Sequence, residues 1–139
     1  MTFDVRETIG YCMQRDLQGV SEDTCVLNAA SLMAARRIGS LVVHPAGAEP
    51  PTSKIIGLLS ETDLIRRVMA KGLTVTGTTV GQVMASPLQS IPSDRLMLDA
   101  SHFMEKHGIR HVCVAEGGSI VGLISVRDLV VFLTNLPRK

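Results

Sequence analysis

The chain has 139 residues, 45% hydrophobic and 19% charged, which suits one compact domain or two small halves with a shared core and argues against disorder. A formal net charge of +1 gives no broad cationic field for a nucleic-acid backbone. No apolar run approaches the roughly 20 residues that cross a bilayer, and residues 1–10 carry charge where a signal peptide would be apolar. We therefore expect a cytoplasmic protein that binds neither nucleic acid nor membrane.

An internal repeat organises the chain. Shifted by 71 positions, the segment TIGYCMQRDLQGVSED, which begins at Thr8, aligns without a gap on TVGQVMASPLQSIPSD, which begins at Thr79. Further along, GLLSETDL from Gly57 matches GLISVRDL from Gly122 at an offset of 65. The first copy therefore has a loop six residues longer (71 minus 65), in HPAGAEPPTSK, where the second copy turns through AEGGS.

In each copy, the sequence pattern predicts a strand, a helix, a hairpin of two strands and a second helix. In chain order, the first copy gives a strand over 17–20, a helix over 26–37, strands over 40–44 and 54–59, and a helix over 61–70. The second gives a strand over 88–91, a helix over 97–107, strands over 110–115 and 119–124, and a helix over 126–134. We expect an α/β (α+β) fold of two β-α-β-β-α repeats, 1–70 and 79–139, joined by a linker over 71–78 and packed about a pseudo-twofold axis.

The turn from each hairpin into its second helix carries one pattern, G-h-h-S-x-x-D-h, over Gly57–Leu64 and again over Gly122–Leu129. Each first helix also carries AxxxM, from Ala29 and from Ala100. On these residues the sequence, from about 9 to 133, resembles the CBS-domain family, the paired regulatory modules named after cystathionine β-synthase. The resemblance implies a sensor of an adenosyl ligand, namely AMP, ADP, ATP, S-adenosylmethionine or an NAD-type molecule, bound in the clefts between the two repeats.

By that resemblance, Asp63 and Asp128 would hold the ribose hydroxyls, and Ser60 and Ser125 would approach the phosphate. The remaining contacts fall into three groups. Leu58 and Leu123 would pack on the adenine; Gln18 to Val20, or Gln89 to Ile91, in the first strand of the opposite repeat, would meet its edge; and Ile38 and Gly39, or Ile109 and Arg110, would line the rest. Arg110 would serve the phosphate in the cleft of Asp128, and His111 the cleft of Asp63, unless both are solvated hairpin residues.

The chemistry of the signature fits a nucleotide. A helix that begins after Ser60 or Ser125 offers backbone N–H groups and a positive dipole end to a phosphate. An ionised aspartate only accepts hydrogen bonds, so it suits a vicinal diol with two donors. Ser-x-x-Asp is also a capping box, in which serine and acid serve only the helix, and both roles can coexist for the serines.

The sequence contains no phosphate loop, nucleophile elbow, HExxH motif or arrangement of a catalytic nucleophile, so we expect neither an enzyme nor a required cofactor or metal. His107 and His111 are four apart, but Gly108 should end the helix between them. With no effector domain in the sequence, the signal of a sensor should pass to an unidentified partner protein. A ligand-free interaction scaffold is the alternative.

A homodimer is also expected. The last helix contains five consecutive apolar residues, from Leu129 to Leu133, which cannot all face one core. In the first copy, the sequence predicts a matching apolar face of Leu64, Ile65, Val68 and Met69. Family resemblance points to association through these helices. The cysteines Cys12, Cys25 and Cys113 lie in apolar patterns without CxxC spacing, which is typical of buried thiols.

Overall fold

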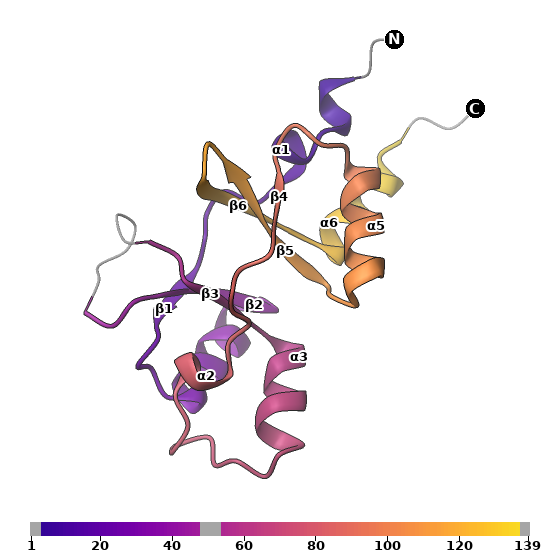
Figure 1. Cartoon of the computed structure of the whole chain (residues 1–139). Helices are drawn as coiled ribbons and strands as arrows, with labels where there is room; N and C mark the ends of the chain where they lie inside the picture. Colours follow the sequence, from indigo (N-terminus) through magenta and orange to yellow (C-terminus); the bar gives the residue numbers. More distant parts are fainter. Residues whose placement is uncertain (1–3, 48–53, 137–139) are drawn as a thin grey trace. The chain divides into compact units, whose positions relative to one another are not determined.

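The computed structural model describes residues 4–47 and 54–136 (Figure 1). The elements up to the end of the first repeat are η1 (Val5–Glu7), α1 (Ile9–Cys12), β1 (Gly19–Ser21), α2 (Val26–Arg36), β2 (Ser40–His44), β3 (Gly57–Ser60), α3 (Glu61–Asp63) and η2 (Leu64–Met69). Those that follow are α4 (Val80–Val83), β4 (Ser90–Pro92), α5 (Met97–His107), β5 (His111–Glu116), β6 (Ser119–Ser125) and α6 (Val126–Thr134). No helix in the described ranges is both long and apolar enough to cross a membrane.

Two three-stranded sheets form, with the orders β1-β2-β3 and β4-β5-β6. In each, the first strand runs parallel to the second, and the second runs antiparallel to the third. The β-α-β-β-α pattern predicted for each repeat is therefore confirmed. The helix expected over 61–70 differs in detail, because only its first turn is α-helical and its continuation η2 is a π-helix.

The compact units of the structure do not coincide with the sequence repeats. One unit is the contiguous stretch Leu17–Leu88, and the other combines Met1–Asp16 with Gln89–Lys139. Residues expected to form a linker between repeats belong to the first of these, where the N–H groups of Val26 and Leu27 donate to the carbonyls of Thr78 and Val75 at 2.8 and 2.9 Å. The opening segment of each repeat thus completes the core built mainly by the other repeat.

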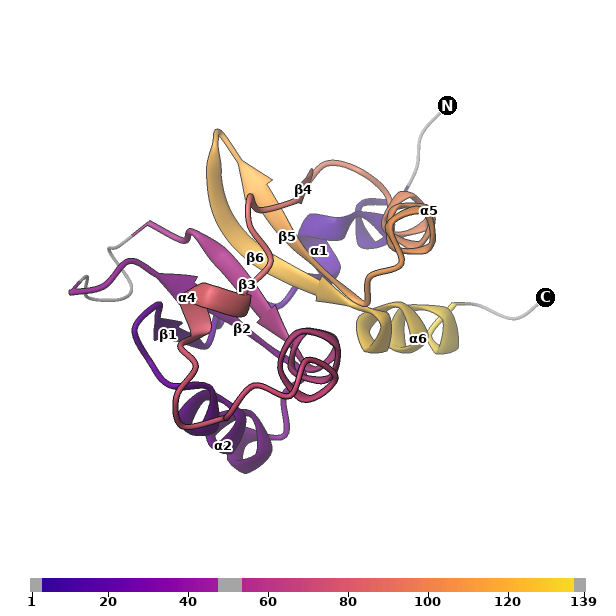
Figure 2. The ribbon, with the colours of Figure 1, turned by 60° about the horizontal axis from the view of Figure 1, so that its bottom comes forward.

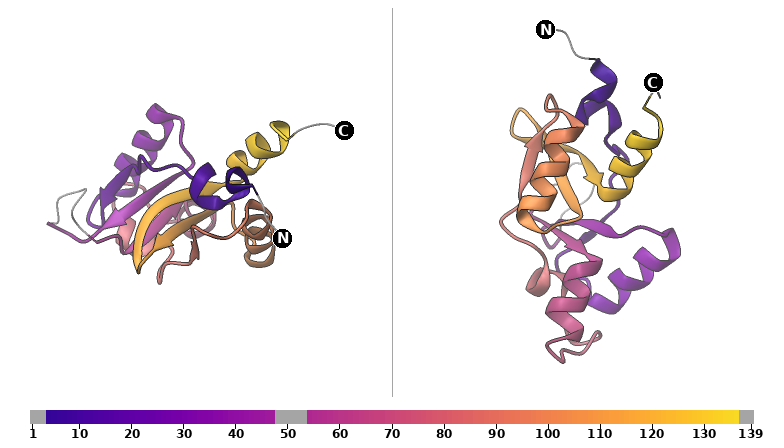
Figure 3. Two further views of the ribbon diagram at one scale, coloured as in Figure 1. Left: turned by 90° about the horizontal axis from the view of Figure 1, so that it is seen from above. Right: turned by 90° about the vertical axis from the view of Figure 1, so that its right-hand side faces the viewer.

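Two short helices, which the sequence periodicity did not predict, attach these opening segments. The Thr8 hydroxyl accepts from Tyr11 N–H at the start of α1, and Thr79 N–H donates to Gln82 at the start of α4. The chain then forms an antiparallel bridge to the outer hairpin strand, at Gln14 with Leu123. An equivalent bridge joins Ala85 to Leu58, and α4 lies beside β3 (Figure 2). In the other unit, α1 lies beside β6 and α5 (Figure 3).

The recurring methionine and glycine residues make this attachment possible. A Cβ on Gly122 would stand well inside van der Waals contact with Met13 Sδ, and one on Gly57 would meet Met84 Sδ in the same way. The backbone carbonyls of Gln14 and Ala85 would lie 3.0 and 3.1 Å from the same added atoms. Both hairpin strands therefore need glycine where the opening segment of the other repeat crosses them.

Each unit has its own hydrophobic core between one face of its sheet and its helices. In the unit 17–88, α2 and η2 pack on the sheet through Ala29, Met33, Leu41, Leu59 and Val68. The core of the other unit holds residues from both ends of the chain, as follows: Ile9, Met13, Ile91, Met97, Ala100, Met104, Val112, Val114 and Ile124. Each core thus takes its residues from both sequence copies.

Candidate functional site

The two signature turns have the same geometry. Ser60 is the residue before α3, its N–H and its hydroxyl donate to Asp63 Oδ2 at 2.9 and 3.0 Å, and Asp63 N–H donates back to the serine Oγ at 3.3 Å. In α6, Ser125 and Asp128 repeat these bonds at 2.8, 3.0 and 3.3 Å. The capping box weighed in the sequence is therefore present twice.

These caps use groups that a ligand was expected to meet. The first amide of each helix is also bonded, because Glu61 N–H donates to the Gly39 carbonyl at 3.0 Å and Val126 N–H to the Arg110 carbonyl at 2.9 Å. The expectation that the first turn offers unpaired N–H groups is thus wrong for the first and third amides of each helix. Among the first three, only the amide of the middle residue, Thr62 or Arg127, remains for a phosphate.

The carboxylate of Asp63 is almost closed off. Its side chain is 12% exposed, and Oδ1 lies 3.6 Å from Nε of Arg67, one helical turn along. The Arg67 guanidinium also donates to the carbonyls of Met84 at 3.1 Å and Val83 at 3.4 Å, at the end of α4. Arg67 therefore links the signature aspartate to the segment that completes this unit.

Asp128 has a different partner. The side-chain amide of Gln14 donates to Oδ1 at 3.1 Å and to Oδ2 at 3.2 Å, and Asp128 is only partly buried. At the position of Arg67 stands Phe132, which packs against the core. Gln14 was not among the predicted site residues. The repeat alignment did contain a signal for it, because Gln14 falls opposite Ala85 within an otherwise similar segment.

The glutamines expected at the adenine edge also have partners inside their own units. Gln18 Oε1 accepts from the Arg36 guanidinium. Gln89 lies opposite His107 in the same way, with Nε2 and Nδ1 3.5 Å apart. Each glutamine thus meets the end of the first helix of its repeat, with an arginine in one unit and a histidine in the other.

Most of the predicted apolar contacts belong to the cores. Val20 and Ile38 pack against the core of the unit 17–88, and Ile109 against that of the other unit. Ile91 is itself a core residue, 5% exposed. Leu58 and Leu123 are buried in β3 and β6 at the bridges to the opening segments.

The residues that open the two hairpins differ strongly. Gly39 offers no side chain, whereas Arg110 is exposed, and its guanidinium makes no hydrogen bond or ion pair within residues 4–47 and 54–136. His111 is half-buried in β5 and pairs with Ser125 across the hairpin. Among the described residues, no group of three or more His, Cys, Asp or Glu side chains could hold a metal ion.

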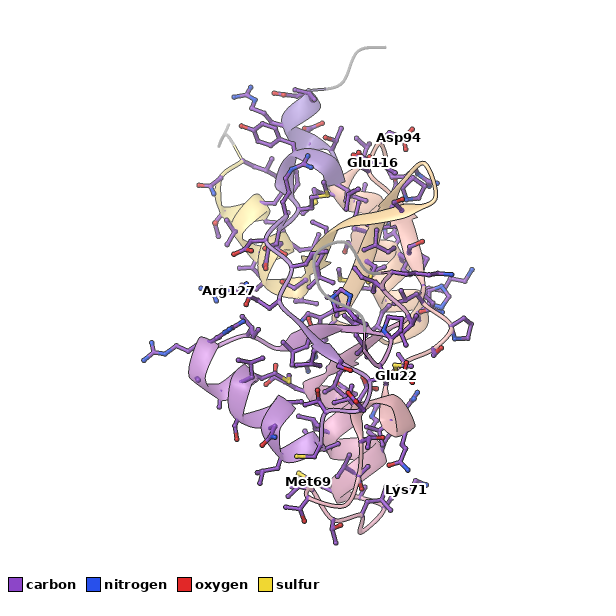
Figure 4. The ribbon with its side chains drawn as sticks, turned by 90° about the vertical axis from the view of Figure 1, so that its left-hand side faces the viewer. Glu22, Met69, Lys71, Asp94, Glu116 and Arg127 are labelled. Carbon is purple, nitrogen blue, oxygen red and sulfur yellow. The ribbon has the colours of Figure 1, made fainter. Side chains whose placement is uncertain are left out.

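The expected apolar helix faces are only partly exposed. In α6, Leu129 and Phe132 pack inward, while Val130, Val131 and Leu133 are 54%, 51% and 61% exposed. In η2 the predicted face is wrong by half, because Val68 is buried and Leu64 packs on the core. The exposed apolar residues of η2 are Ile65 and Met69. Figure 4 shows the side chains of Met69 and of Arg127 in α6 at the surface.

Comparison with known proteins places these features in a family. Residues 5–70 and 80–135 match the model of the CBS domain. The CBS domain-containing protein CBSCBSPB2 of Arabidopsis thaliana is 30% identical over 107 residues, 77% of this chain but 19% of that relative. The mitochondrial CBSX3 of the same plant is 26% identical over 129 residues, which cover 91% of this chain. The chain thus spans 19% and 61% of the lengths of these two relatives.

Solved structures agree with the fold. A conserved protein from Pyrococcus horikoshii is 28% identical with a TM-score of 0.84, and the match covers 99% of this chain and 98% of that one. A protein from Burkholderia ambifaria, named for CBS domains and signal transduction, is 27% identical with a TM-score of 0.77 over 90% and 88% of the two chains. Two three-stranded sheets with their helices are therefore the architecture shared with tandem CBS structures.

Proposed function

Because the chain belongs to the CBS-domain family, whose pairs are generally regulatory rather than catalytic, we propose that it is a regulatory module that binds an adenosyl nucleotide. The ligand would be AMP, ADP, ATP, S-adenosylmethionine or an NAD-type molecule, held at the signature aspartates. A change in occupancy would be passed to a partner protein. The observation that carries this proposal is the carboxylate of Asp128, which is partly exposed and bound on Oδ1 only by a neutral amide.

The carboxylate chemistry suits a ribose. Oδ2 of Asp128 accepts both bonds of the serine cap, so the cap can persist while Oδ1 changes partner. Two adjacent hydroxyls supply two donors to an oxygen pair that can only accept. A phosphate would be repelled by the same charge, so the diol is the part of a nucleotide that fits here.

Arg110 supports the phosphate end of the proposal. Its exposed guanidinium, unpaired among the described residues, stands three residues after the C-terminus of α5 and one before β5. A guanidinium matches phosphate oxygens in fork geometry and stays charged at every relevant pH. The carbonyl of the same residue binds the first amide of α6, so its backbone is fixed beside the signature turn.

A thermal-shift panel with AMP, ADP, ATP, S-adenosylmethionine, NADH and adenosine tests the proposal. A ligand at about a hundred times its dissociation constant adds roughly 2.7 kcal/mol of stability. The proposal requires at least one member of the panel to raise the melting temperature in a concentration-dependent way. If none does, the chain is not a sensor of adenosyl ligands.

Calorimetric titration of AMP and adenosine then tests Arg110. Arg110→Ala should weaken AMP binding about tenfold or more, because a hydrogen bond to a charged group contributes roughly 1.5 to 3 kcal/mol, and should leave adenosine unchanged. Lys106→Ala is the matched control, because it removes one positive charge from an exposed position in the last turn of α5. Equal losses in both variants would indicate a general charge effect, and no loss in either would remove Arg110 from the site.

The second candidate is a ligand-free dimeric interaction scaffold, and the completeness of the two capping boxes favours it. In that case Ser60→Ala and Ser125→Ala would each lower the free energy of unfolding by about 1 kcal/mol, as loss of a helix cap does, and no nucleotide would bind. In the sensor, the same variants would lose stability and also bind nucleotide more weakly.

Homodimerisation is part of the proposal under either function. The exposed apolar side chains of α6 and η2 would be covered by a second copy, since such patches on soluble chains commonly mark interfaces. Sedimentation at micromolar concentration should give a dimer, and Val130→Asp with Leu133→Asp should give a monomer. Leu98→Asp, on the 62% exposed Leu98 of α5, is the control and should remain dimeric.

A further inference from the structure

We infer that the nucleotide binds at Asp128 and not at Asp63, so that each chain takes one ligand. This inference rests on the proposed function and deepens it. The two signature turns are equal in backbone and in capping bonds, so the choice between them depends on the side chains that surround each carboxylate. Two differences between the units favour Asp128.

The first difference is the partner of the carboxylate. At Asp63 a diol would have to displace a cation, Arg67, which is itself held by two backbone carbonyls at the end of α4. At Asp128 it would displace the neutral amide of Gln14. Two hydroxyl donors can replace two amide donors without separating opposite charges, so the exchange is favourable only at Asp128.

The second difference is the charge available for phosphate. The unit with Asp128 has Arg110 at the opening of its hairpin, and the other unit has Gly39 there. In the unit 17–88, Arg36 and Arg67 are already bound to Gln18, Asp63 and the α4 carbonyls. The exposed Arg37 lies at the C-terminal end of α2, two residues before Gly39 rather than at the hairpin opening itself. Only the Asp128 turn thus combines an exchangeable carboxylate with an arginine that has no other partner in the described chain.

Isothermal titration with AMP tests the inference on the full chain and on two matched variants, Asp63→Asn and Asp128→Asn. Asparagine keeps an oxygen that can accept the capping N–H but removes the charge. We expect one AMP per chain in the wild type, an affinity at least about tenfold lower in Asp128→Asn, and an affinity within about twofold of wild type in Asp63→Asn.

A second measurement needs no variant. In a ¹⁵N-labelled wild-type chain, AMP should shift the amide resonances of Ser125 to Asp128 and the side-chain amide of Gln14, and should leave Ser60 to Asp63 largely unmoved. Shifts centred on Ser60 to Asp63, two AMP molecules per chain, or loss of binding in Asp63→Asn alone would each overturn the inference while the proposed function stands. If no adenosyl ligand binds at all, both fail together.

Discussion

The two compact units have the same arrangement of strands, but the signature aspartate has a different side-chain partner in each unit. The contiguous unit 17–88 fixes its signature aspartate with a cation from the same helix, Arg67, whereas the other unit uses an amide from the distant N-terminal segment, Gln14. What recurs at both sites is the serine cap and the close approach of a methionine to a glycine. The residues that recur in both repeats are therefore those that the backbone conformation requires. The positions that differ between the repeats give the two aspartates different chemical surroundings.

Ile9→Ala should have the largest effect, because it removes a buried side chain that the opening segment contributes to the core built mainly by the other repeat. Ile9 is fully buried in a core with Ile91 and Ile124, so its truncation should lower the free energy of unfolding by about 2 to 5 kcal/mol. Hydrogen exchange should show loss of protection first in β4, β5 and β6, in the unit of the second repeat. Val80→Ala, at the equivalent buried position, should act first on β1, β2 and β3. Loss of protection in the opposite order would contradict the exchange of opening segments.

Cys113 should make the stability of its unit depend on pH in the alkaline range, whereas the equivalent residue of the other unit, Val42, cannot titrate. It is buried, and burial raises the pKa of its thiol from 9.0 to about 11. At pH 8 about a hundredfold less thiolate should form than for an exposed cysteine, so Cys113 should react correspondingly slowly with a thiol reagent. Mass spectrometry of a Cys12→Ser, Cys25→Ser variant measures this rate, with the urea-unfolded chain as control.

The sign of the linked stability effect follows from the same pKa. Because the folded value is raised, the stabilisation is fully present below about pH 9 and is lost as the pH rises toward 11. Val42 holds the equivalent place in the unit 17–88, so this alkaline loss should begin in the unit of Cys113. Rapid labelling of Cys113 at pH 8 in the folded chain would contradict the prediction.

Gly122→Ala and Gly57→Ala should destabilise the two units by similar amounts, because the two glycines have equivalent neighbours. Each methyl group would meet a methionine side chain and a backbone carbonyl, so each variant should lose about 1 to 3 kcal/mol in urea unfolding. Combining Gly122→Ala with Met13→Ala should cost less than the sum of the two single variants, because the larger clash is removed. Strict additivity would indicate that the methionine does not limit the space.

The smallest expected effect concerns acid. The pKa of Asp99 is held below its usual value, chiefly by the N–H of Leu96 and also by Arg95. A lowered pKa stabilises the folded chain above about pH 4, and this contribution is lost as the pH falls through the folded value. Asn28 stands at the equivalent place in the first repeat. Asp99→Asn should therefore flatten the loss of stability between pH 5 and pH 3 by only a few tenths of a kcal/mol, since Asp99 is partly exposed.

Urea unfolding midpoints at pH 5 and pH 3, for the wild type and for Asp99→Asn, provide the measurement. A coulombic contribution from His102 lowers the same pKa by the smallest amount. A variant whose midpoint falls as steeply as that of the wild type would show that other carboxylates dominate the acid response.

Much of the fold could be predicted from the sequence because its signals are local. The α5 and α6 boundaries match the apolar periodicity, and the second hairpin turns at Gly117 and Gly118 as its sequence predicts. The strand predicted over 54–59 is shorter, because β3 begins only at Gly57. The short helices α1 and α4 were missed, since four residues are too few to display a helical period. The exchange of opening segments could not be predicted, because an alignment of two similar copies does not show whether each opening segment packs on its own copy or on the other one.

The candidate site was predicted in part for the same reason. The positions of Ser60, Asp63, Ser125 and Asp128 follow from their pattern, and so does the capping geometry. Arg67 lies at i+4 from Asp63, so that ion pair could have been found from spacing alone. The contact of Gln14 with Asp128 joins residues 114 positions apart, and no local rule predicts it.

The exchanged opening segments set an order of events for a chain that is still being synthesised. Residues up to Leu88 contain everything the contiguous unit needs, so it can form as soon as they leave the ribosome. The first 16 residues must wait with Ile9 and Met13 uncovered until α5, β5 and β6 have emerged. At roughly 5 to 20 residues per second, the wait lasts a few seconds. During that interval the segment around Ile9 and Met13 exposes apolar side chains, and a chaperone that binds early could bind it there.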